Sequence, residues 1–330
     1  MDLEEPILHL SSKKSKISII LLTLVISIIV ILGTSESSSY NRVHNGLEFY
    51  TVKEGASYNS ILKNFSLHPL QEVMLKIYIR VNGINVAQAG HYYIKNQSWK
   101  NFISSVNNGD VAIFKLQIPE GKNLFEIKRI LSDSNLINDC SNFNCLDNRF
   151  DFIEGTLKPE TYFYKNSSSA ARLLQQSQEE FFQLANSYWL KKSSDLPLDN
   201  LADALILASI VEKEAGNDDE KPIIAGVFLH RLSIGMKLQA DPTIIYGLMP
   251  DFNGNITKAN LKDRNNPFNT YQISGLPPTP ISTISQSSLE AVILGMKNDY
   301  LYFVAKGDGT HKFSKTYEEH LEAVRKYQLN

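Results

Sequence analysis

Hydrophobic residues recur with helical spacing through most of the second half of the chain. The stretch 266–282, "NPFNTYQISGLPPTPIS", is too rich in proline for a helix or a central strand, so we expect an ordered loop there. The spacing elsewhere predicts a helix-rich second domain, residues 149–330, with helices over 169–192, 198–216, 221–235, 241–248, 288–297 and 315–328 and a strand over 300–307.

The first half instead shows short alternating segments next to short helical ones. "YTVKEGASYNSIL" (50–62) resembles "LQIPEGKNLFEIKRIL" (116–131), since each has a strand pattern, a Glu-Gly pair and a helix with isoleucine six residues after the glycine. A further strand is predicted over 89–94, and a helix over 98–109 that ends at its glycine. These patterns predict an α+β region over 47–148 and an α+β fold class overall.

The N-terminus carries an uncharged apolar run over 17–33, "ISIILLTLVISIIVILG". Its length falls within the range of a membrane-spanning helix. Three lysines within 13–16 precede it, so the positive-inside rule puts the 1–16 tail in the cytoplasm. The alternative is a cleaved signal peptide, but "LGTSES" is a poor cleavage site. We therefore expect a retained transmembrane helix, followed by a serine-rich tether over 34–46.

Charge and cysteine content exclude several functions and leave one question open. The 33 basic and 35 acidic residues give a net charge of −2, so nothing favours a nucleic-acid partner. No phosphate-binding loop, G-x-S-x-G elbow or paired-histidine helix occurs, so neither a cofactor nor a metal is expected. Cys140 and Cys145 form a disulfide or remain two free thiols; no histidine lies near enough for a metal site.

The best candidate for chemistry is a glutamate in "LASIVEKEAG" (207–216). On a helical wheel Glu212 falls in line with Ala204, Ala208 and Ala215, and this stripe of small residues leaves space beside its carboxylate. Glu214 points about 200° away at the helical period. We therefore expect Glu212 in an enclosed groove, where burial raises the pKa of a carboxyl group and suits it to donate a proton, and Glu214 in solvent.

Each of these acidic residues has an ordinary structural explanation as well. A last helical turn that reads Glu-Lys-Glu is usually solvated surface. Asp241, in "LQADPT", is a second candidate for chemistry, but an aspartate before a proline is also a common helix N-cap. The pattern alone leaves both questions open.

Six blocks in order resemble the endolytic murein transglycosylases, the MltG or YceG-like family. They cover most of the chain from about residue 50 onward, and the N-terminal anchor resembles the family as well. The blocks are "IPEGKNLFEI", "EGTLKPETYFY" (154–164), "ASIVEKEAG", "LQADPTIIYG" (238–247), "NPFNTYQISGLPPTPIS" and "YLYFVAKGDGTHKFSKTYEEH" (300–320).

The resemblance implies a bitopic enzyme of the inner (plasma) membrane. A LysM-like region and a catalytic domain would lie on the extracytoplasmic side. It implies cleavage of the β-1,4 bond between N-acetylmuramic acid and N-acetylglucosamine within a glycan strand. An enzyme held at the membrane reaches nascent strands, so we expect it to terminate glycan polymerisation and to have penicillin-binding proteins or other peptidoglycan polymerases as partners.

The resemblance also implies site residues. The catalytic glutamate of the family lies in the "SIVEKE" block, where we assign it to Glu212. Protonating the leaving oxygen and then accepting the proton of the muramyl C6 hydroxyl would need only this one group, because that hydroxyl closes a 1,6-anhydro ring without water. By the same mapping, Gln239, Asp241, Asn269 and Tyr271 are expected to line the substrate groove.

Two other functions stay open at this point. A muramidase that uses water would need a second carboxylate, for which Asp241 is the candidate beside Glu212. A peptidoglycan-binding protein without catalysis would use the LysM-like region, with Glu212 serving only a structural purpose.

Overall fold

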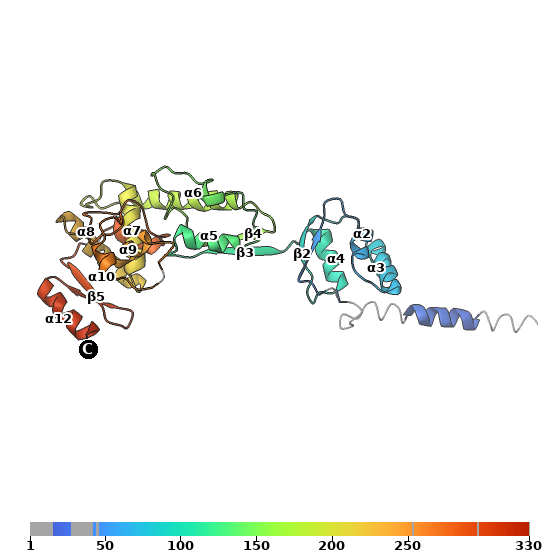
Figure 1. The fold of residues 1–330 in the computed structure, drawn as a ribbon. Helices are drawn as coiled ribbons and strands as arrows, with labels where there is room; N and C mark the ends of the chain where they lie inside the picture. Colours follow the sequence, from blue (N-terminus) through green and yellow to red (C-terminus); the bar gives the residue numbers. More distant parts are fainter. Residues whose placement is uncertain (1–15, 28–41, 44–45, 253, 296, 330) are drawn as a thin grey trace, which may run out of the picture. The chain divides into compact units, whose positions relative to one another are not determined.

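The structure, a computed structural model, describes residues 16–27, 42–43, 46–252, 254–295 and 297–329 (Figure 1). The chain divides into two compact units, residues 1–114 (unit 1) and 115–330 (unit 2). This division comes earlier than the boundary expected after residue 148. The mixed α+β fold class is confirmed, because both units combine helices with short strands.

Unit 1 is built around an antiparallel strand pair in which Phe49 faces Tyr93. Its core is aromatic: Trp99 and Phe102 are buried and pack edge-on against each other. The helix α3 was not expected from the sequence, since its hydrophobic residues are spread round the helix and only Leu75 is buried. In chain order the elements are β1 (Phe49–Val52), α2 (Tyr58–Lys63), α3 (Pro69–Val81), β2 (Gly90–Tyr93) and α4 (Trp99–Asn108).

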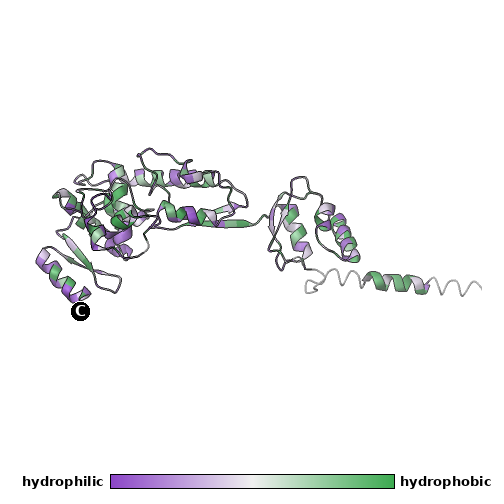
Figure 2. Ribbon diagram, in the orientation of Figure 1, coloured by the Kyte–Doolittle hydropathy of each residue, from purple (hydrophilic) through white to green (hydrophobic). Residues whose placement is uncertain are grey.

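The N-terminal predictions fall largely outside the described residues. The expected membrane span is described only in part, as a hydrophobic helix over 16–27 (Figure 2). Among the residues that the structure covers, no helix has the length and apolar character needed to cross a membrane. The serine-rich part of the expected tether lies outside the described residues; near its end, Val43 is buried and its N–H donates to the carbonyl of Gln97.

Unit 2 contains two strand pairs and the helices between them. The β3–β4 pair begins the unit, and the antiparallel β5–β6 hairpin comes near its end. In chain order the elements are β3 (Ile113–Ile118), α5 (Leu124–Ser132), the 3₁₀ helix η2 (Ser141–Phe143), β4 (Glu160–Lys165), α6 (Ala170–Trp189), α7 (Leu201–Glu214), the 3₁₀ helix η3 (Asp218–Glu220), α8 (Lys221–Ser233), α9 (Asp241–Gly247), α10 (Lys258–Lys262), α11 (Gln286–Ile293), β5 (Tyr302–Ala305), β6 (His311–Ser314) and α12 (Tyr317–Gln328).

Helix α7 forms the centre of the unit 2 core. Every residue from Ala204 to Val211 is buried, as its nearly continuous apolar sequence requires. Helix α11 packs against both α7 and α8, which enclose it from two sides. The Asn200 side chain caps the helix by accepting a hydrogen bond from the N–H of Asp203 at 2.9 Å. The predicted central, buried helix is therefore confirmed.

The C-terminal part of unit 2 is a hairpin covered by α12. Strand β5 was predicted, whereas β6 was not. Helix α12 packs on both strands and is otherwise mostly hydrophilic (Figure 2). Its buried contribution is Ala323. The hairpin and α12 together form one wall of the cavity described below.

The two repeated Glu-Gly segments do adopt the same local structure. Gly55 follows β1 and Gly121 follows β3, and both have left-handed backbone with φ of +72° and +67°. Such a conformation favours glycine, because a Cβ atom is strained there. The isoleucine six residues on, Ile61 or Ile127, is buried in each case. The echo in the sequence therefore marks two copies of a strand–turn–helix unit.

The two cysteines are paired. Cys140 and Cys145 form a disulfide that closes the short loop containing η2. Of the two alternatives left open by the sequence, the structure has the disulfide.

Candidate active site

The carboxylate of Glu212 is held by the N-terminus of α11. Its Oε2 accepts hydrogen bonds from the N–H of Ser285 at 3.1 Å, from the Ser285 hydroxyl and from Ser288 Oγ at 2.6 Å. Lys221 Nζ lies 3.3 Å from the same oxygen, and the two side chains are only 5% and 7% exposed. Cationic and N–H donors of this kind stabilise a carboxylate anion. Glu212 is thus buried as expected, but in an ion pair rather than beside open space.

Glu214 lies in a cavity of about 540 Å³. The cavity is walled by residues of α7, α8, the segment before α9, the β5–β6 hairpin and α12, among them Glu214, Arg231, Gln239, Asp241, Tyr271 and His311. Within the described ranges no group donates a hydrogen bond to the Glu214 carboxyl. That carboxyl group is therefore available to a ligand.

The expectation that Glu214 points to solvent is wrong. The residue that surfaces is Lys213, whose side chain is exposed and whose Nζ donates to the carbonyl of Gly121 at 3.1 Å. The helical wheel separated the two glutamates correctly onto different faces. It could not show that α8 and the hairpin, which follow later in the chain, cover the second face as well.

The surroundings of Glu214 suit it to hold a proton. Burial raises its pKa, the negative charge of Asp241 raises it further, and the positive charge of Arg231 offsets part of the rise, which leaves a pKa of about 8. A carboxylic acid with this pKa is mostly protonated at neutral pH. It can then act as a general acid.

Three of the four predicted groove residues come together at this cavity: Gln239, Asp241 and Tyr271. The Tyr271 hydroxyl donates to Asp241 Oδ1 at 2.8 Å, and burial together with this bond raises the pKa of Tyr271. Gln239 has φ of +52°, a left-handed conformation that is costly for a residue with a side chain and is often found at functional sites. Binding of substrate by these three residues stays a prediction.

Asp241 does not cap α9, as its sequence context suggested it could. The N-cap residue is Ala240, no side chain caps the helix, and Asp241 is the first helical residue. Its carboxylate instead points to Tyr271, on a different segment of the chain. The capping explanation for Asp241 is therefore removed.

Asn269, the fourth predicted groove residue, lies apart from the cavity. It is fully buried, and its Nδ2 donates to the carbonyls of Asn260 at 3.0 Å and Asp263 at 2.7 Å. Its Oδ1 accepts from the N–H of Tyr271 at 3.1 Å. Asn269 therefore holds the loop that presents Tyr271, and the expectation that it lines the groove is not met.

The turn after α7 is fixed to the tip of the hairpin. Ala215 is the C-cap of α7, and Gly216, which follows it, has no positive φ. A Cβ atom at Gly216 would lie 2.4 Å from the carbonyl oxygen of Gly309. Asn217 Nδ2 also donates to that oxygen at 3.3 Å. Glycine is needed at 216 because the two backbone segments are in contact.

A further buried glutamate supports α9 from the opposite side. Glu154 accepts hydrogen bonds from the N–H of Leu124 and from the Tyr246 hydroxyl at 2.9 Å. Burial raises the pKa of Glu154 to about 7 although these donors lower it. It thereby connects the start of α5 to α9, the helix that carries Asp241. Glu154 is the first residue of the family-like block 154–164, and the sequence pattern alone did not indicate a role for it.

Two other residues of the cavity were missed, Arg231 and His311. Arg231 is buried, and it donates from Nε to the carbonyl of Leu301 at 2.7 Å and from Nη1 to that of Leu238 at 2.6 Å. His311 lies within the quoted block "GDGTHKF". A single histidine or arginine gives no periodic signal, so only the family-like block pointed to the hairpin.

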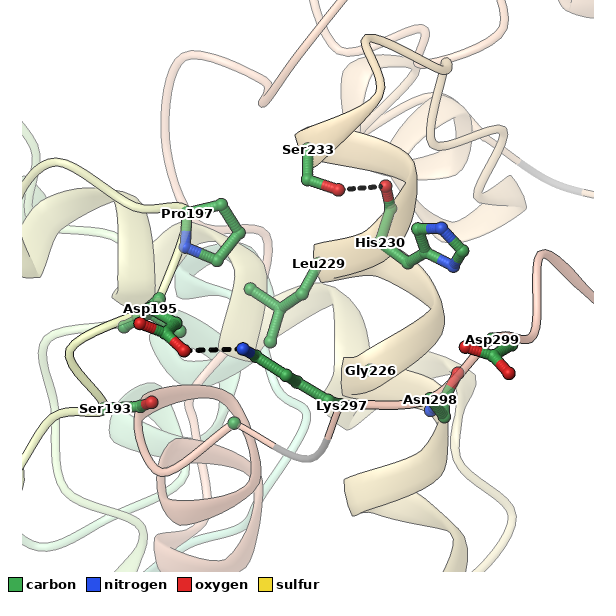
Figure 3. Close-up of a pocket in the computed structure, with 12 residues that line it drawn as sticks. Ser193, Asp195, Pro197, Gly226, Leu229, His230, Ser233, Lys297, Asn298 and Asp299 are labelled. Carbon is green, nitrogen blue, oxygen red and sulfur yellow. Dashed lines mark hydrogen bonds and ion pairs between the residues drawn. The ribbon is translucent and has the colours of Figure 1, made fainter.

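A separate cavity of about 300 Å³ lies between α8 and the segments around 195 and 297 (Figure 3). Lys297 Nζ and Asp195 Oδ2 form an ion pair of 2.5 Å beside it. Figure 3 shows Pro197 and Leu229 on its wall next to this pair. None of the predicted site residues lines this cavity.

Sequence comparison decides the family. Residues 50–326 match the profile of the YceG-like family. The chain belongs to this family. The resemblance inferred from the six blocks is confirmed.

YceG-like relatives of known name support the same grouping. The chain is 29% identical over 283 residues to an endolytic murein transglycosylase of Bacillus subtilis (strain 168), covering 78% of this chain and 77% of that protein. It is 33% identical over 174 residues to an endolytic murein transglycosylase of Streptococcus pneumoniae (serotype 2, strain D39), covering 51% of this chain and 31% of that protein. A crystal structure of a yceG-like protein from Listeria monocytogenes superposes with a TM-score of 0.56 at 28% identity, covering 83% of this chain and 98% of that one.

Proposed function

We propose that this protein is a lytic transglycosylase that cleaves the β-1,4 bond between N-acetylmuramic acid and N-acetylglucosamine within peptidoglycan strands. One observation carries the proposal: a carboxyl group with a pKa of about 8 faces a cavity that is also lined by Asp241, Tyr271 and Gln239. The names of the YceG-like relatives support the substrate class.

The proton donor in this proposal is Glu214 rather than Glu212. The Glu212 carboxylate already accepts hydrogen bonds from Ser285 and Ser288 and pairs with Lys221. Four donors therefore already occupy its Oε2, and Glu212 is not among the residues that line the cavity of Glu214. Glu212 instead fixes the end of α7 against α11, and this contact positions Glu214.

The reaction follows from the protonation state of Glu214. The protonated carboxyl donates to the glycosidic oxygen as the bond from C1 of the muramyl sugar to that oxygen breaks, and the oxygen stays on C4 of N-acetylglucosamine as a hydroxyl group. The C6 hydroxyl of the same muramyl sugar forms the new bond to C1 and gives up its proton to a base of the site. Because the nucleophile belongs to the substrate, its effective concentration is high and no water molecule is needed. The product carries a 1,6-anhydro-muramyl end.

A muramidase that uses water is the second candidate, favoured by one observation. Asp241 lines the same cavity as Glu214, and its charge acts on the Glu214 carboxyl. An inverting glycosidase uses such a pair, with one carboxyl as acid and the other as base for water. In this second reaction the product would have a reducing end.

Mass spectrometry of the released muropeptides separates the two reactions. We expect the full chain in detergent to release 1,6-anhydro-muramyl products from purified glycan strands, and the Glu214→Gln variant to release none above background. Reducing ends in place of anhydro ends would reject the transglycosylase and favour the muramidase. Equal activity of wild type and Glu214→Gln would reject the assignment of the proton donor.

Unit 1 is proposed to bind peptidoglycan as a LysM-like region. The support is its β1–α2–α3–β2 order with the two strands paired antiparallel. We expect the inactive Glu214→Gln full chain to co-sediment with purified sacculi. Replacement of exposed residues of unit 1 should weaken this association, and sedimentation unaffected by all such replacements would reject the assignment.

The location and cellular role are proposed from the sequence. The apolar run 17–33 and the lysines before it support a single-pass anchor in the plasma membrane, with unit 2 outside the cytoplasm. Such an enzyme would cut nascent strands and terminate their polymerisation beside penicillin-binding proteins or other polymerases. Accessibility labelling of single cysteines at 5 and 160 in whole cells tests the topology: label at 5 but not at 160 would reject it.

A further inference from the structure

His311 is a second ionisable side chain on the wall of the Glu214 cavity. It is the first residue of β6, and it is bound at two points by Glu220, the last residue of η3. Glu220 Oε1 accepts from the His311 backbone N–H at 2.8 Å, and Glu220 Oε2 accepts from the ring Nδ1 at 2.8 Å. Both side chains are 12% exposed. The imidazole is therefore held in one orientation.

This pairing determines which ring nitrogen is free. An ionised carboxylate only accepts hydrogen bonds, so the proton on the neutral imidazole lies on Nδ1 and the lone pair lies on Nε2. A carboxylate behind an imidazole also stabilises the imidazolium that forms when Nε2 takes up a proton. His311, oriented by Glu220, can therefore act as a general base through Nε2. Within the described residues, no hydrogen bond occupies His311 Nε2.

The base and the acid are attached to one short segment of chain. Glu214 ends α7, and six residues later Glu220 binds His311. Between them, Gly216 and Asn217 contact the backbone of Gly309 at the hairpin tip. This arrangement fixes the hairpin, and with it the imidazole, relative to Glu214.

The other ionisable groups of the cavity come from the elements packed round it. They are Arg231 from α8, Asp241 from α9, Tyr271 from the loop, Tyr302 from β5, and Tyr317 and His320 from α12. Arg231 already donates to two backbone carbonyls, and Tyr271 donates to Asp241. His320 lacks a carboxylate partner in the described residues, since its buried Nδ1 has no hydrogen bond. His311 is the histidine of the cavity with a carboxylate behind it.

We propose that His311 is the general base of the reaction, and this inference rests on the proposed function of the site. Glu214 still carries its proton when the C6 hydroxyl begins to attack, so a second group has to accept the hydroxyl proton in a concerted step. His311 Nε2 takes that proton while O6 bonds to C1, the bond from C1 to the leaving oxygen breaks, and Glu214 protonates that oxygen. The enzyme is left with an imidazolium and a carboxylate, and one proton returned through solvent restores both.

The pH profile of kcat tests this assignment. A neutral His311 and a protonated Glu214 are both required, so the wild type should give a bell-shaped profile. We expect His311→Gln to lower kcat about 100-fold, the scale of one general base, to change KM little and to abolish the acid limb. Glu220→Gln should keep the bell shape but lower kcat, because the imidazolium that forms in the reaction loses the carboxylate behind it. His9→Gln, in the N-terminal tail over 1–16, is the matched histidine control and should leave the profile unchanged.

Chemical rescue separates a base from a structural contact. With His311→Ala, added imidazole should restore part of kcat in proportion to its concentration, and it should have no effect on Glu214→Ala. Two outcomes overturn the inference. One is an acid limb that survives in His311→Gln. The other is a His311→Ala variant with unchanged thermal unfolding whose kcat imidazole does not restore. An active Glu214→Gln would instead reject the proposed function itself, so the two failures are distinguishable.

Discussion

Glu212 and Glu214 are two residues apart on one helix, and both are withdrawn from solvent, yet their surroundings are opposite. Glu212 meets Lys221, two serine hydroxyls and the N-terminus of α11. Glu214 meets a cavity, the charge of Asp241 and only the partial compensation of Arg231. The same residue type is thus ion-paired and hydrogen-bonded in one place and faces a cavity without a hydrogen-bond donor in the other. Burial alone does not distinguish the two glutamates. The hydrogen-bond donors around each carboxyl group do distinguish them.

The largest expected difference between the two glutamates is in catalysis. Glu214→Gln should lower kcat by about 1,000-fold, because loss of a general acid typically costs 10² to 10⁴. Glu212→Gln keeps the shape of the side chain and one oxygen that accepts hydrogen bonds. It should lower kcat about tenfold or less, through small displacements of the end of α7. Initial rates on purified glycan strands measure both. A larger loss for Glu212→Gln in a protein with unchanged thermal unfolding would reverse the assignment and restore the prediction made from the sequence.

Stability should reverse that order. Glu212→Ala leaves the buried Lys221 without its buried partner, so the free energy of unfolding should fall by about 3 kcal/mol. Glu214→Ala removes a carboxyl group with no hydrogen-bond donor, whose raised pKa costs stability at pH 7, so it should not lower the free energy of unfolding. Urea unfolding at pH 7 measures both values. Adding Lys221→Met to Glu212→Ala should recover part of the loss, and equal losses for the two single variants would contradict the comparison.

Asn269 and Gln239 extend the comparison to the predicted groove residues. Asn269→Ala leaves the carbonyls of Asn260 and Asp263 without their donor, so it should lower the free energy of unfolding by about 2 kcal/mol. Gln239→Ala, at an exposed position, should change it by about 0.5 kcal/mol or less and act on KM instead. Measuring the free energy of unfolding and KM for both variants tests these two predictions. An altered KM for Asn269→Ala at full stability would return that residue to the groove.

The raised pKa of Glu214 also predicts a pH dependence of stability. Glu214 holds its proton more tightly in the folded chain, where its pKa is about 8, than in the unfolded chain, where it is near 4.5. Unfolding therefore releases a proton between these values, and stability falls as the pH rises through that window. Glu214→Gln should remove this share of the fall and be the more stable protein at pH 9. Thermal unfolding at pH 5 to 9 tests this, with Glu154 contributing equally to both proteins; parallel curves would contradict the raised pKa.

The sequence was informative where the pattern is local and repeated. The apolar run of α7 predicted a buried helix, and the two Glu-Gly segments predicted two strand–turn–helix units. Both predictions were possible because helix periodicity and turn preference depend on residues that are close in the sequence. The same holds for the family, which six ordered blocks identified. Gln239, Asp241 and Tyr271 were found through those blocks and do share a cavity.

The sequence was uninformative where the outcome depends on distant segments. The wheel could not show that residues near 231, 241 and 311 would close over Glu214, because these lie between 17 and 97 positions away in the chain. It also could not show that Ser285 and Ser288 would meet Glu212. Asn269 was grouped with Tyr271 because they are neighbours in sequence, yet one side chain faces the loop interior and the other faces the cavity. In each of these cases, contacts between segments that are distant in the sequence determine where the side chain lies.

The contact between Gly216 and Gly309 has a consequence for how this site can vary. Two backbones in direct contact admit no side chain at 216, so the length of the α7–η3 turn and that of the β5–β6 hairpin cannot change independently. An insertion in either one would separate the segment that carries Glu214 from the strand that carries His311. Any grafted or redesigned version of this site should therefore transfer both segments together, as a single unit with fixed spacing.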